Sequence, residues 1–407
     1  MIGPESYPDR TSLEAAFAAH VDPGKVDIWR MGDLQLAMGD RAGARFQDAY
    51  SGRWFYNCHC NGGVFNLGHR NPRVVAAVRA ALDHADIGNH HLVSPYRAAA
   101  AERLAATTDG ALPGVVFSVG GGEAVDLALK LARAHTGRTT IVSVEGAYHG
   151  HTGLALAAGS GSERALFHNE LPGFVRVPYN DLDALEAAVD ERTAAVILES
   201  IPATAGFPMP APGYLAGVRA ACDGAGALLV LDEVQTGLGR TGTTWYFQQE
   251  DVTPDLLVAG KGLSGGVYPI AATLMTADLH RFFGDHPFSH VSTYGGADLG
   301  CVAAAEVCDI IGEPGFAERV QAVGRRLETA FADLAFTVRR RGMLLALVFD
   351  EEHGGMTAMK ALFDRGVYAF FASFDPRVLQ FKPALVATDD DVEAIVATVR
   401  DAFPPLR

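Results

Sequence analysis

The chain has 407 residues, more than a single hydrophobic core usually holds, which predicts two domains or one large domain with a smaller lobe. Its hydrophobic content of 49% suits a globular protein, and its longest apolar runs are too short to cross a bilayer, so we expect no membrane partner. A formal charge of −15 makes nucleic acid a poor partner, because phosphate backbones bind basic surfaces.

The N-terminus and the cysteines indicate the compartment. The first residues, MIGPESYPDRTSLEAAF, contain early acids and no apolar segment behind a basic start, so we expect no secretory signal and a cytoplasmic protein. Five scattered cysteines argue against a disulfide framework. The run Cys58-His59-Cys60 suggests a metal, but no second Cys/His pair at ligand spacing accompanies it, so we predict no metal site.

Helical and strand-like patterns alternate along most of the chain, which predicts an α/β fold with a largely parallel sheet. Asn71-Pro72 opens an amphipathic helix. The apolar run Val115–Val119 predicts a strand, and three glycines then lead into a helix over Glu123–Ala134. Further buried strands are predicted at Thr140–Val144, Ala194–Leu198, Leu228–Leu231 and Leu256–Val258.

After about residue 300 the pattern changes to long helices and a mixed set of strands. Strands are expected at Leu344–Phe349 and Val378–Phe381, and a last helix at Asp389–Phe403. We therefore predict a large domain over residues 46–295. The N-terminal residues 1–45 and the C-terminal residues 296–407 would form a smaller α/β domain.

Polar groups follow the predicted strands, at the edge where open α/β sheets bind their ligands. Gly120-Gly121-Gly122 stands between a strand and a helix, where backbone N–H groups and the helix dipole favour an anion. The turn is not a P-loop, because no Gly-Lys-Ser/Thr follows, and it does not match the dinucleotide fingerprint. Asp232 ends an apolar strand, and a carboxylate there needs a cationic partner.

Lys261 follows another buried strand and is flanked by glycines and apolar residues. Lysine is rarely buried without a function or a partner, and desolvation lowers its pKa so that the amine can attack a carbonyl. A lysine for a Schiff base, an acid for a ring nitrogen and a phosphate cradle are the needs of pyridoxal 5'-phosphate. Tyr148, after the strand Thr140–Val144, is a candidate to cover the ring.

At this point the sequence resembles the class III aminotransferases, the fold-type-I subgroup that includes ornithine and γ-aminobutyrate aminotransferases. The likeness runs from about Asp40 to Phe403 and is strongest in Asp232-Glu-Val-Gln-Thr-Gly with Lys261 at its proper distance. Other matching motifs are Asn66-Leu-Gly-His-Arg-Asn-Pro72, Tyr148-His-Gly150, Pro212-Gly-Tyr214 and Ser292-Thr-Tyr-Gly-Gly296.

The resemblance implies a pyridoxal-phosphate transferase fold and a role for each matching residue. Lys261 would bind the cofactor and shuttle the proton, and Asp232 would face the ring nitrogen. Gln235 would lie near the ring hydroxyl. The remaining cofactor contacts implied are Gly121, Gly122, Tyr148, Glu199, Ser292 and Thr293. Because Thr293 would reach the phosphate of a neighbouring subunit, we expect a homodimer with shared active sites.

Departures from the family pattern bear on the substrate, a small-molecule amine or carbonyl. Relatives that use glutamate and 2-oxoglutarate generally place an arginine, a glutamate and a second arginine where this chain has His151, Thr204 and Gln380. These side chains cannot reproduce the bidentate grip of arginine on a carboxylate. Gly62, where many relatives have a bulky aromatic, would widen the pocket, and His91 is a further candidate lining residue.

The hypothesis is therefore an aminotransferase for a sizeable neutral or cationic amine or aldehyde, such as an aminosugar or aminoglycoside intermediate of antibiotic biosynthesis. Some motifs, including Ala158-Gly-Ser-Gly161, also resemble glutamate-semialdehyde aminomutase, so a mutase or epimerase on a similar substrate is the alternative. A nicotinamide-dependent dehydrogenase lacks its fingerprint here. A non-catalytic relic would have no need to keep both Asp232 and Lys261.

Overall fold

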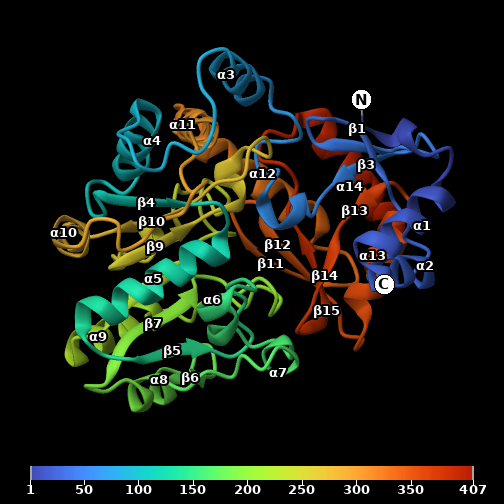
Figure 1. Ribbon diagram of the computed structural model, residues 1–407. Coiled ribbons are helices and arrows are strands. Elements are labelled where there is room, and N and C mark those ends of the chain that lie inside the picture. Colours follow the sequence, from blue (N-terminus) through green and yellow to red (C-terminus); the bar gives the residue numbers. More distant parts are fainter. Residues whose placement is uncertain (1, 406–407) are drawn as a thin grey trace.

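The computed structural model describes residues 2–405, and its centre is a seven-stranded sheet with the order β4-β10-β9-β8-β7-β5-β6 (Figure 1). All neighbours in it are parallel except β10, which runs antiparallel to β4 and β9. The predicted mostly parallel α/β fold is confirmed. The strands are β4 (Gly114–Ser118), β5 (Thr140–Val144), β6 (Phe174–Val177), β7 (Thr193–Glu199), β8 (Leu228–Asp232), β9 (Leu256–Ala259) and β10 (Ala271–Met275).

The central strands are apolar on both sides because helices cover both faces of the sheet. In β8, Val230 packs into the core beneath helix α5 (Gly121–Thr136), whereas Leu229 and Leu231 pack into the core on the other face. Helix α5 lies across the near face in Figure 1. The sheet is therefore buried along its whole middle, and polar groups reach a cavity only beyond the strand ends.

The smaller lobe combines the two ends of the chain, drawn in blue and red in Figure 1. It contains two four-stranded sheets, with the orders β1-β2-β3-β13 and β11-β12-β15-β14. In the first sheet β3 pairs in parallel with β13, so that Tyr56 lies opposite Val367. The strands are β1 (Met38–Ala42), β2 (Arg45–Asp48), β3 (Trp54–Asn57), β11 (Thr337–Arg341), β12 (Leu344–Val348), β13 (Val367–Tyr368), β14 (Phe370–Ala372) and β15 (Asp375–Phe381).

The edges of these sheets do not coincide with the domain boundaries expected at residues 46 and 295. Strands β2 and β3 belong to the smaller lobe, because Phe46 and Phe55 pack into its core. Helix α11 (Asp298–Ile311) packs instead against α3 and α4, next to the large sheet. Neither shift was visible in the sequence, since β2 and β3 are short and α11 is apolar enough for either core.

The helices complete both lobes, and within residues 2–405 none is long and apolar enough to cross a membrane. They are α1 (Arg10–His20), α2 (Pro23–Met31), α3 (Pro72–Leu82), α4 (Pro95–Ala106), α6 (Gly153–Ala158), α7 (Glu163–Leu166), α8 (Leu182–Ala188), α9 (Tyr214–Ala225), α10 (Ala277–Asp285), α12 (Phe316–Phe331), α13 (Gly354–Phe363), α14 (Asp389–Ala402) and the short 3-10 helices η1 (Pro4–Ser6), η2 (Cys60–Gly63), η3 (Tyr246–Gln249) and η4 (Lys261–Ser264).

A buried arginine ties the two lobes together. The guanidinium of Arg240 donates to Oδ1 of Asn66 at 2.6 Å and, through Nη1, to the carbonyls of Met343 at 3.0 Å and Pro383 at 2.7 Å. Burial lowers the pKa of Arg240 to about 10, so the group is still charged at neutral pH. Because three segments distant in sequence share this one cation, Arg240 fixes how the smaller lobe sits over the sheet.

Candidate active site

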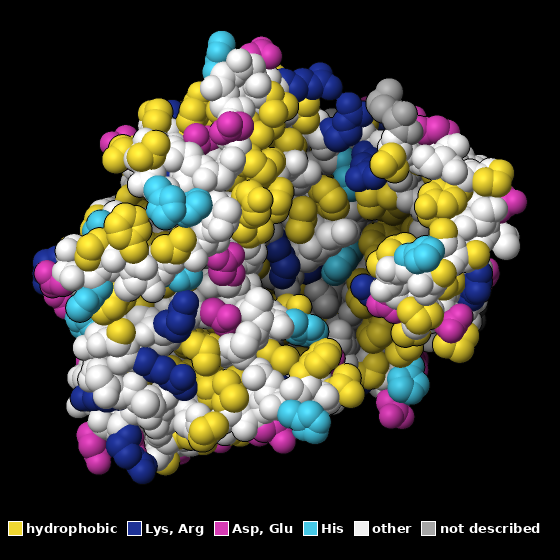
Figure 2. Space-filling view, viewed as in Figure 1, with side chains coloured by type: hydrophobic (Ala, Val, Ile, Leu, Met, Phe, Trp, Pro, Cys, Tyr) yellow, Lys and Arg dark blue, Asp and Glu magenta, His cyan; other side chains and the backbone are white. Residues whose placement is uncertain are grey.

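Three neighbouring parallel strands end at the same edge of the large sheet and place polar groups together. The register pairs Glu199 with Asp232 and Asp232 with Val258, and Lys261 follows two residues after β9. In Figure 1 these strands point toward the junction of the lobes, where Figure 2 shows a hollow in the surface. A cavity of about 160 Å³ at this edge is lined by Gly121, Gly122, Tyr148, His149, Gly150, Glu199, Asp232, Val234, Gln235 and Lys261.

Asp232 is held in place from two sides. His149 is buried, and its Nδ1 donates to Oδ2 of Asp232 at 2.8 Å. The backbone N–H of Val234 donates to Oδ1 at 3.1 Å. The other ring nitrogen of His149, Nε2, is buried without a partner among residues 2–405. The sequence marked the motif Tyr148-His149-Gly150 but assigned no role to His149, which the structure identifies as the residue that orients the acid.

Glu199 lies beside Asp232 because their strands are in register. Its carboxyl accepts the backbone N–H groups of Tyr148 at 3.0 Å and Ala203 at 3.2 Å. Burial, and secondarily the adjacent Asp232 carboxylate, raises the pKa of Glu199 to about 7. The Glu199 carboxyl therefore holds a proton more readily than a free glutamate does.

The acid next to Asp232 in sequence has a different task. Glu233 accepts the backbone N–H groups of Tyr246 at 2.6 Å and Phe247 at 2.8 Å, and the hydroxyl of Ser200 at 3.2 Å. Burial raises the pKa of Glu233 to about 7. Glu233 therefore anchors the loop after β8, and of this acidic pair only Asp232 faces the cavity.

Lys261 is half-buried and begins helix η4 in the left-handed region, with φ of +42°. Such a conformation in a residue with a side chain is strained and is typical of functional sites. Burial lowers the pKa of Lys261, although the carboxylates of Asp232 and Glu199 oppose this. The fraction of Lys261 side chains with a neutral amine is therefore larger than for an exposed lysine at the same pH.

Gly62 makes room for this lysine. A Cβ at position 62 would lie 3.1 Å from Cε of Lys261 and 3.4 Å from Oε1 of Gln235, and φ there is +71°. Only glycine adopts this backbone readily. The sequence predicted that Gly62 widens the substrate pocket, and the structure places the gained space directly against the lysine side chain.

Two glycines allow a close contact beside the N-terminus of α5. A Cβ on Gly150 would lie 2.8 Å from Cα of Gly122, and a Cβ on Gly122 would lie 2.9 Å from Oγ1 of Thr152. Helix α5 has 16 residues, so its first N–H groups and its dipole favour an anion at this end. Gly121 and Gly122 thus lie where a phosphate cradle was expected.

Some expected site residues lie outside this cavity within the chain. Ser292 lines a different cavity together with His90 and Phe288, and Thr293 is exposed. His91 is also exposed, with its ring centroid 6.0 Å from that of Phe288. These residues share a surface of their own, so a role at an active site would have to be at that of another subunit.

None of the candidate substrate residues His151, Thr204 and Gln380 lines the Lys261 cavity itself. His151 is exposed, with its ring centroid 5.2 Å from that of Tyr148. Thr204 donates from Oγ1 to the carbonyl of Gly146 at 3.1 Å. Gln380 is buried and donates from Nε2 to the carbonyl of Phe371 at 3.4 Å. None of the three carries a fixed charge that could pair with a carboxylate.

Lys382, to which the sequence motifs assign no role, is completely buried. Its ammonium donates to Oε1 of Gln235 at 2.9 Å and to Oε1 of Gln380 at 2.8 Å. The signal was available, since only five of the 33 basic residues are lysines and Lys382 stands in the apolar run that ends in Pro383.

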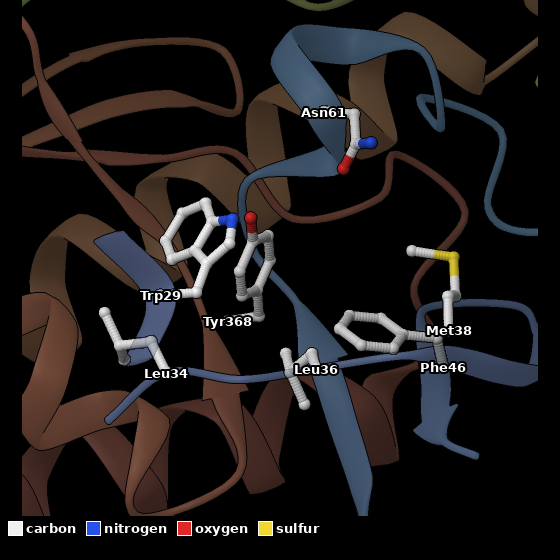
Figure 3. A pocket seen from close by; sticks show the side chains of 7 residues that line it. All are labelled: Trp29, Leu34, Leu36, Met38, Phe46, Asn61 and Tyr368. Atoms are coloured by element: carbon white, nitrogen blue, oxygen red, sulfur yellow. The ribbon is translucent and has the colours of Figure 1, made fainter. Parts of the chain in front are cut away.

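A second cavity, of about 170 Å³, lies in the smaller lobe and is drawn in Figure 3. Trp29 and Tyr368 lie side by side there, and Asn61 stands above them. Leu34, Leu36, Met38 and Phe46 complete an apolar lining without an acid or a basic group. This cavity can hold an apolar group but offers no acid–base chemistry. Within residues 2–405 no cluster of three metal-ligating side chains exists, Cys58-His59-Cys60 included.

Comparisons with known proteins agree with this geometry. The sequence profile of the family described as aminotransferase class-III matches residues 32–403. An uncharacterized aminotransferase of Archaeoglobus fulgidus is 46% identical over 392 residues, covering 95% of this chain and 92% of that protein.

Solved structures are similar over most of their length. The ornithine aminotransferase of Toxoplasma gondii, with pyridoxal phosphate at partial occupancy in its active site, has a TM-score of 0.84 at 28% identity, covering 90% of this chain and 89% of that chain. The taurine:2-oxoglutarate aminotransferase of Bifidobacterium kashiwanohense, in complex with pyridoxal phosphate and glutamate, has a TM-score of 0.83 at 25% identity, covering 90% and 92%.

Replacing Glu199 with glutamine tests the raised pKa of this carboxyl. Between the ordinary value of 4.5 and the folded value of about 7 the folded protein binds the extra proton, so Glu199 makes stability fall as pH rises through this interval. The free energy of unfolding of Glu199→Gln should therefore rise by about 2 to 3 kcal/mol relative to wild type from pH 4.5 to pH 8. Denaturant titrations measure it, with Glu186→Gln on the exposed face of α8 as the flat control. A difference that does not change with pH contradicts the assignment.

Proposed function

Because this chain belongs to the class-III aminotransferases, which depend on pyridoxal 5'-phosphate, we propose that Lys261 carries the cofactor and that the substrate is a sizeable neutral or cationic amine or aldehyde. The observation that supports this substrate most directly is the environment of Gln380. Its oxygen accepts from Lys382 and its N–H groups face the carbonyl of Phe371, so no charged fork points into the site.

The residues of the cavity fit the cofactor. When bound, pyridoxal phosphate supplies a carbonyl that condenses with amines and a ring that withdraws electrons. Asp232, fixed by His149, would hold a proton on the ring nitrogen, and the N-terminus of α5 would bind the phosphate. Tyr148 lines the same cavity and would cover the ring, while Nζ of Lys261 would move the substrate proton.

The positions that hold carboxylates in relatives support a substrate without one. Thr204 is occupied by its hydrogen bond to Gly146, and His151 is exposed at the rim. Lys382 lies nearby, but it does not line the Lys261 cavity. A net charge of −15 favours the approach of a cation. An aminosugar or aminoglycoside intermediate of antibiotic biosynthesis has this chemistry and a size that suits an open site.

Covalent trapping tests the attachment point. Borohydride reduction of the yellow holoenzyme followed by peptide mapping should find the cofactor on Lys261, and Lys261→Ala should lose the bound chromophore and at least about 1000-fold in activity. Lys130→Ala, which changes an exposed lysine, is the control and should keep both. A cofactor adduct on any other side chain contradicts the proposed role of Lys261.

Substrate preference is measured with steady-state assays on a panel of amines. We expect kcat/KM for an amino-cyclitol or aminosugar to exceed that for γ-aminobutyrate or ornithine by about 100-fold or more, because no arginine lines the Lys261 cavity to bind a carboxylate. A preference for the two amino acids would defeat the proposal. Incubation of one substrate without an acceptor separates transamination from the mutase or epimerase alternative, since only the latter yields an isomerised product.

A homodimer with shared active sites completes the proposal. Large apolar side chains are exposed next to Ser292 and in the segment that follows His91, whose ring lies near that of Phe288, and this favours burial against a second copy. Val93 is 96% exposed, Phe288 70% and Val291 51%. Phe288, Val291 and Ser292 line one cavity, so the patch is continuous with the segment expected to reach the neighbouring phosphate.

Charged residues in this patch should separate the subunits. The double change Val93→Glu and Phe288→Glu buries two unpaired carboxylates in the interface and should yield monomers with at least about 10-fold lower activity. Sedimentation velocity measures the change in mass. Leu166→Glu, at an exposed leucine of α7, is the matched control and should leave the assembly intact. Wild-type protein that sediments as a monomer at high concentration would refute the dimer.

A further inference from the structure

Lys382 is a completely buried lysine whose side chain no carboxylate contacts within residues 2–405. Its partners are two amide oxygens, Oε1 of Gln235 at 2.9 Å and Oε1 of Gln380 at 2.8 Å. Its Nζ also lies 5.2 Å from the ring centroid of Phe207. Burying an ammonium group lowers the free energy of unfolding by several kcal/mol unless its surroundings compensate the charge. A methionine would fill the same volume without this cost. Stability alone therefore does not explain a lysine at this position.

The two contacts determine how both amides are turned. A lysine ammonium only donates hydrogen bonds, so each glutamine must present its oxygen and not its nitrogen to Lys382. Gln380 then directs its N–H groups to the carbonyl of Phe371. Gln235 lines the Lys261 cavity, and its side-chain N–H groups make no hydrogen bond within the described chain. They are left to donate to whatever the cavity holds.

We propose that Lys382 is a positioning residue that locks the Gln235 carboxamide with its N–H donors facing the cofactor and that places a second positive charge beside Lys261. This inference rests on the proposed attachment of the cofactor to Lys261. The ring hydroxyl of the cofactor is an acceptor, and its anionic form is stabilised by a fixed donor and a nearby cation. The same charge makes it harder for the nitrogen of Lys261 to hold a proton.

The ionisable groups around Lys382 come from several elements. Lys261 on η4 and Arg240 on the loop after β8 add positive charge, whereas Cys60 and the more distant Glu199 favour the ammonium. His59 also faces both lysines, and burial and their charges keep the pKa of this imidazole well below its usual value. Burial, followed by the charge of Lys261, lowers the pKa of Lys382. A bound anion in the cavity would offset that effect.

The test is the pH dependence of the visible absorption of the holoenzyme, whose midpoint reports the protonation of the Lys261 nitrogen. Four proteins are compared: wild type, Lys382→Met, Gln235→Leu and the double variant. Lys382→Met keeps the length of the side chain and removes the charge and the donors. We expect its midpoint to rise by about one pH unit and its affinity for pyridoxal phosphate to fall by about 3- to 10-fold.

The double variant shows whether Lys382 acts through Gln235. If it does, Lys382→Met should add less than about half of its single-variant shift in the Gln235→Leu background. Lys382→Arg retains a charged, donor-only side chain and should stay near the wild-type midpoint. If Lys382→Met does not fold, Lys382→Gln replaces it, because a neutral amide still bonds both glutamines and should also raise the midpoint.

The outcomes separate the two proposals. If the pH midpoint of the visible absorption does not shift in Lys382→Met or Lys382→Gln while the visible band is intact, the proposed role of Lys382 is wrong and the proposed function stands. A lower melting temperature with an unshifted midpoint counts against the role of Lys382 in the same way. An equal shift with and without Gln235 would overturn the positioning role. A wild-type protein that binds no chromophore at Lys261 would overturn the proposed function itself.

Discussion

The whole site depends on the register of three parallel strands. Because β7, β8 and β9 run side by side in one direction, Glu199, Asp232 and Lys261 arrive at one edge with little freedom to move apart. That edge is buried, so every charge brought there must find donors, acceptors or an opposite charge. Neighbouring groups supply these partners: the imidazole of His149 donates to Asp232, and backbone N–H groups donate to Glu199.

The two lobes supply different partners for the buried polar groups of the site. The large domain supplies backbone N–H groups and one histidine from the loops that follow its strands. The smaller lobe supplies Gln380 from β15 and Lys382 directly after this strand, and Arg240 binds both lobes. Hydrogen bonds inside such a low-dielectric region strengthen one another, so a change at β15 can be felt at Lys261 without direct contact.

The sequence predicted the large sheet well because its buried strands are continuous apolar runs with polar residues only at their ends. It placed Asp232 and Lys261 for the same reason. It missed β10 and the short β1–β3, whose patterns are too brief to stand out, and it could not separate the tasks of Asp232 and Glu233, since their faces depend on the turn after β8. Lys382 and His149 act through other side chains, and a contact between Gln235 and Lys382 leaves no mark in local sequence.

The pairing of β3 with β13 has a consequence for biosynthesis. Tyr56 on β3 pairs with Val367 on β13, more than 300 residues later in the chain. The core of the smaller lobe likewise packs Phe46 and Phe55 against residues near the C-terminus. A nascent chain emerging from the ribosome can pair β1, β2 and β3 with one another and assemble the large sheet, yet the other edge of β3 must remain unpaired until β13 is synthesised. Until then the aromatic side chains of β2 and β3 are exposed, and we expect chaperones to bind them during synthesis.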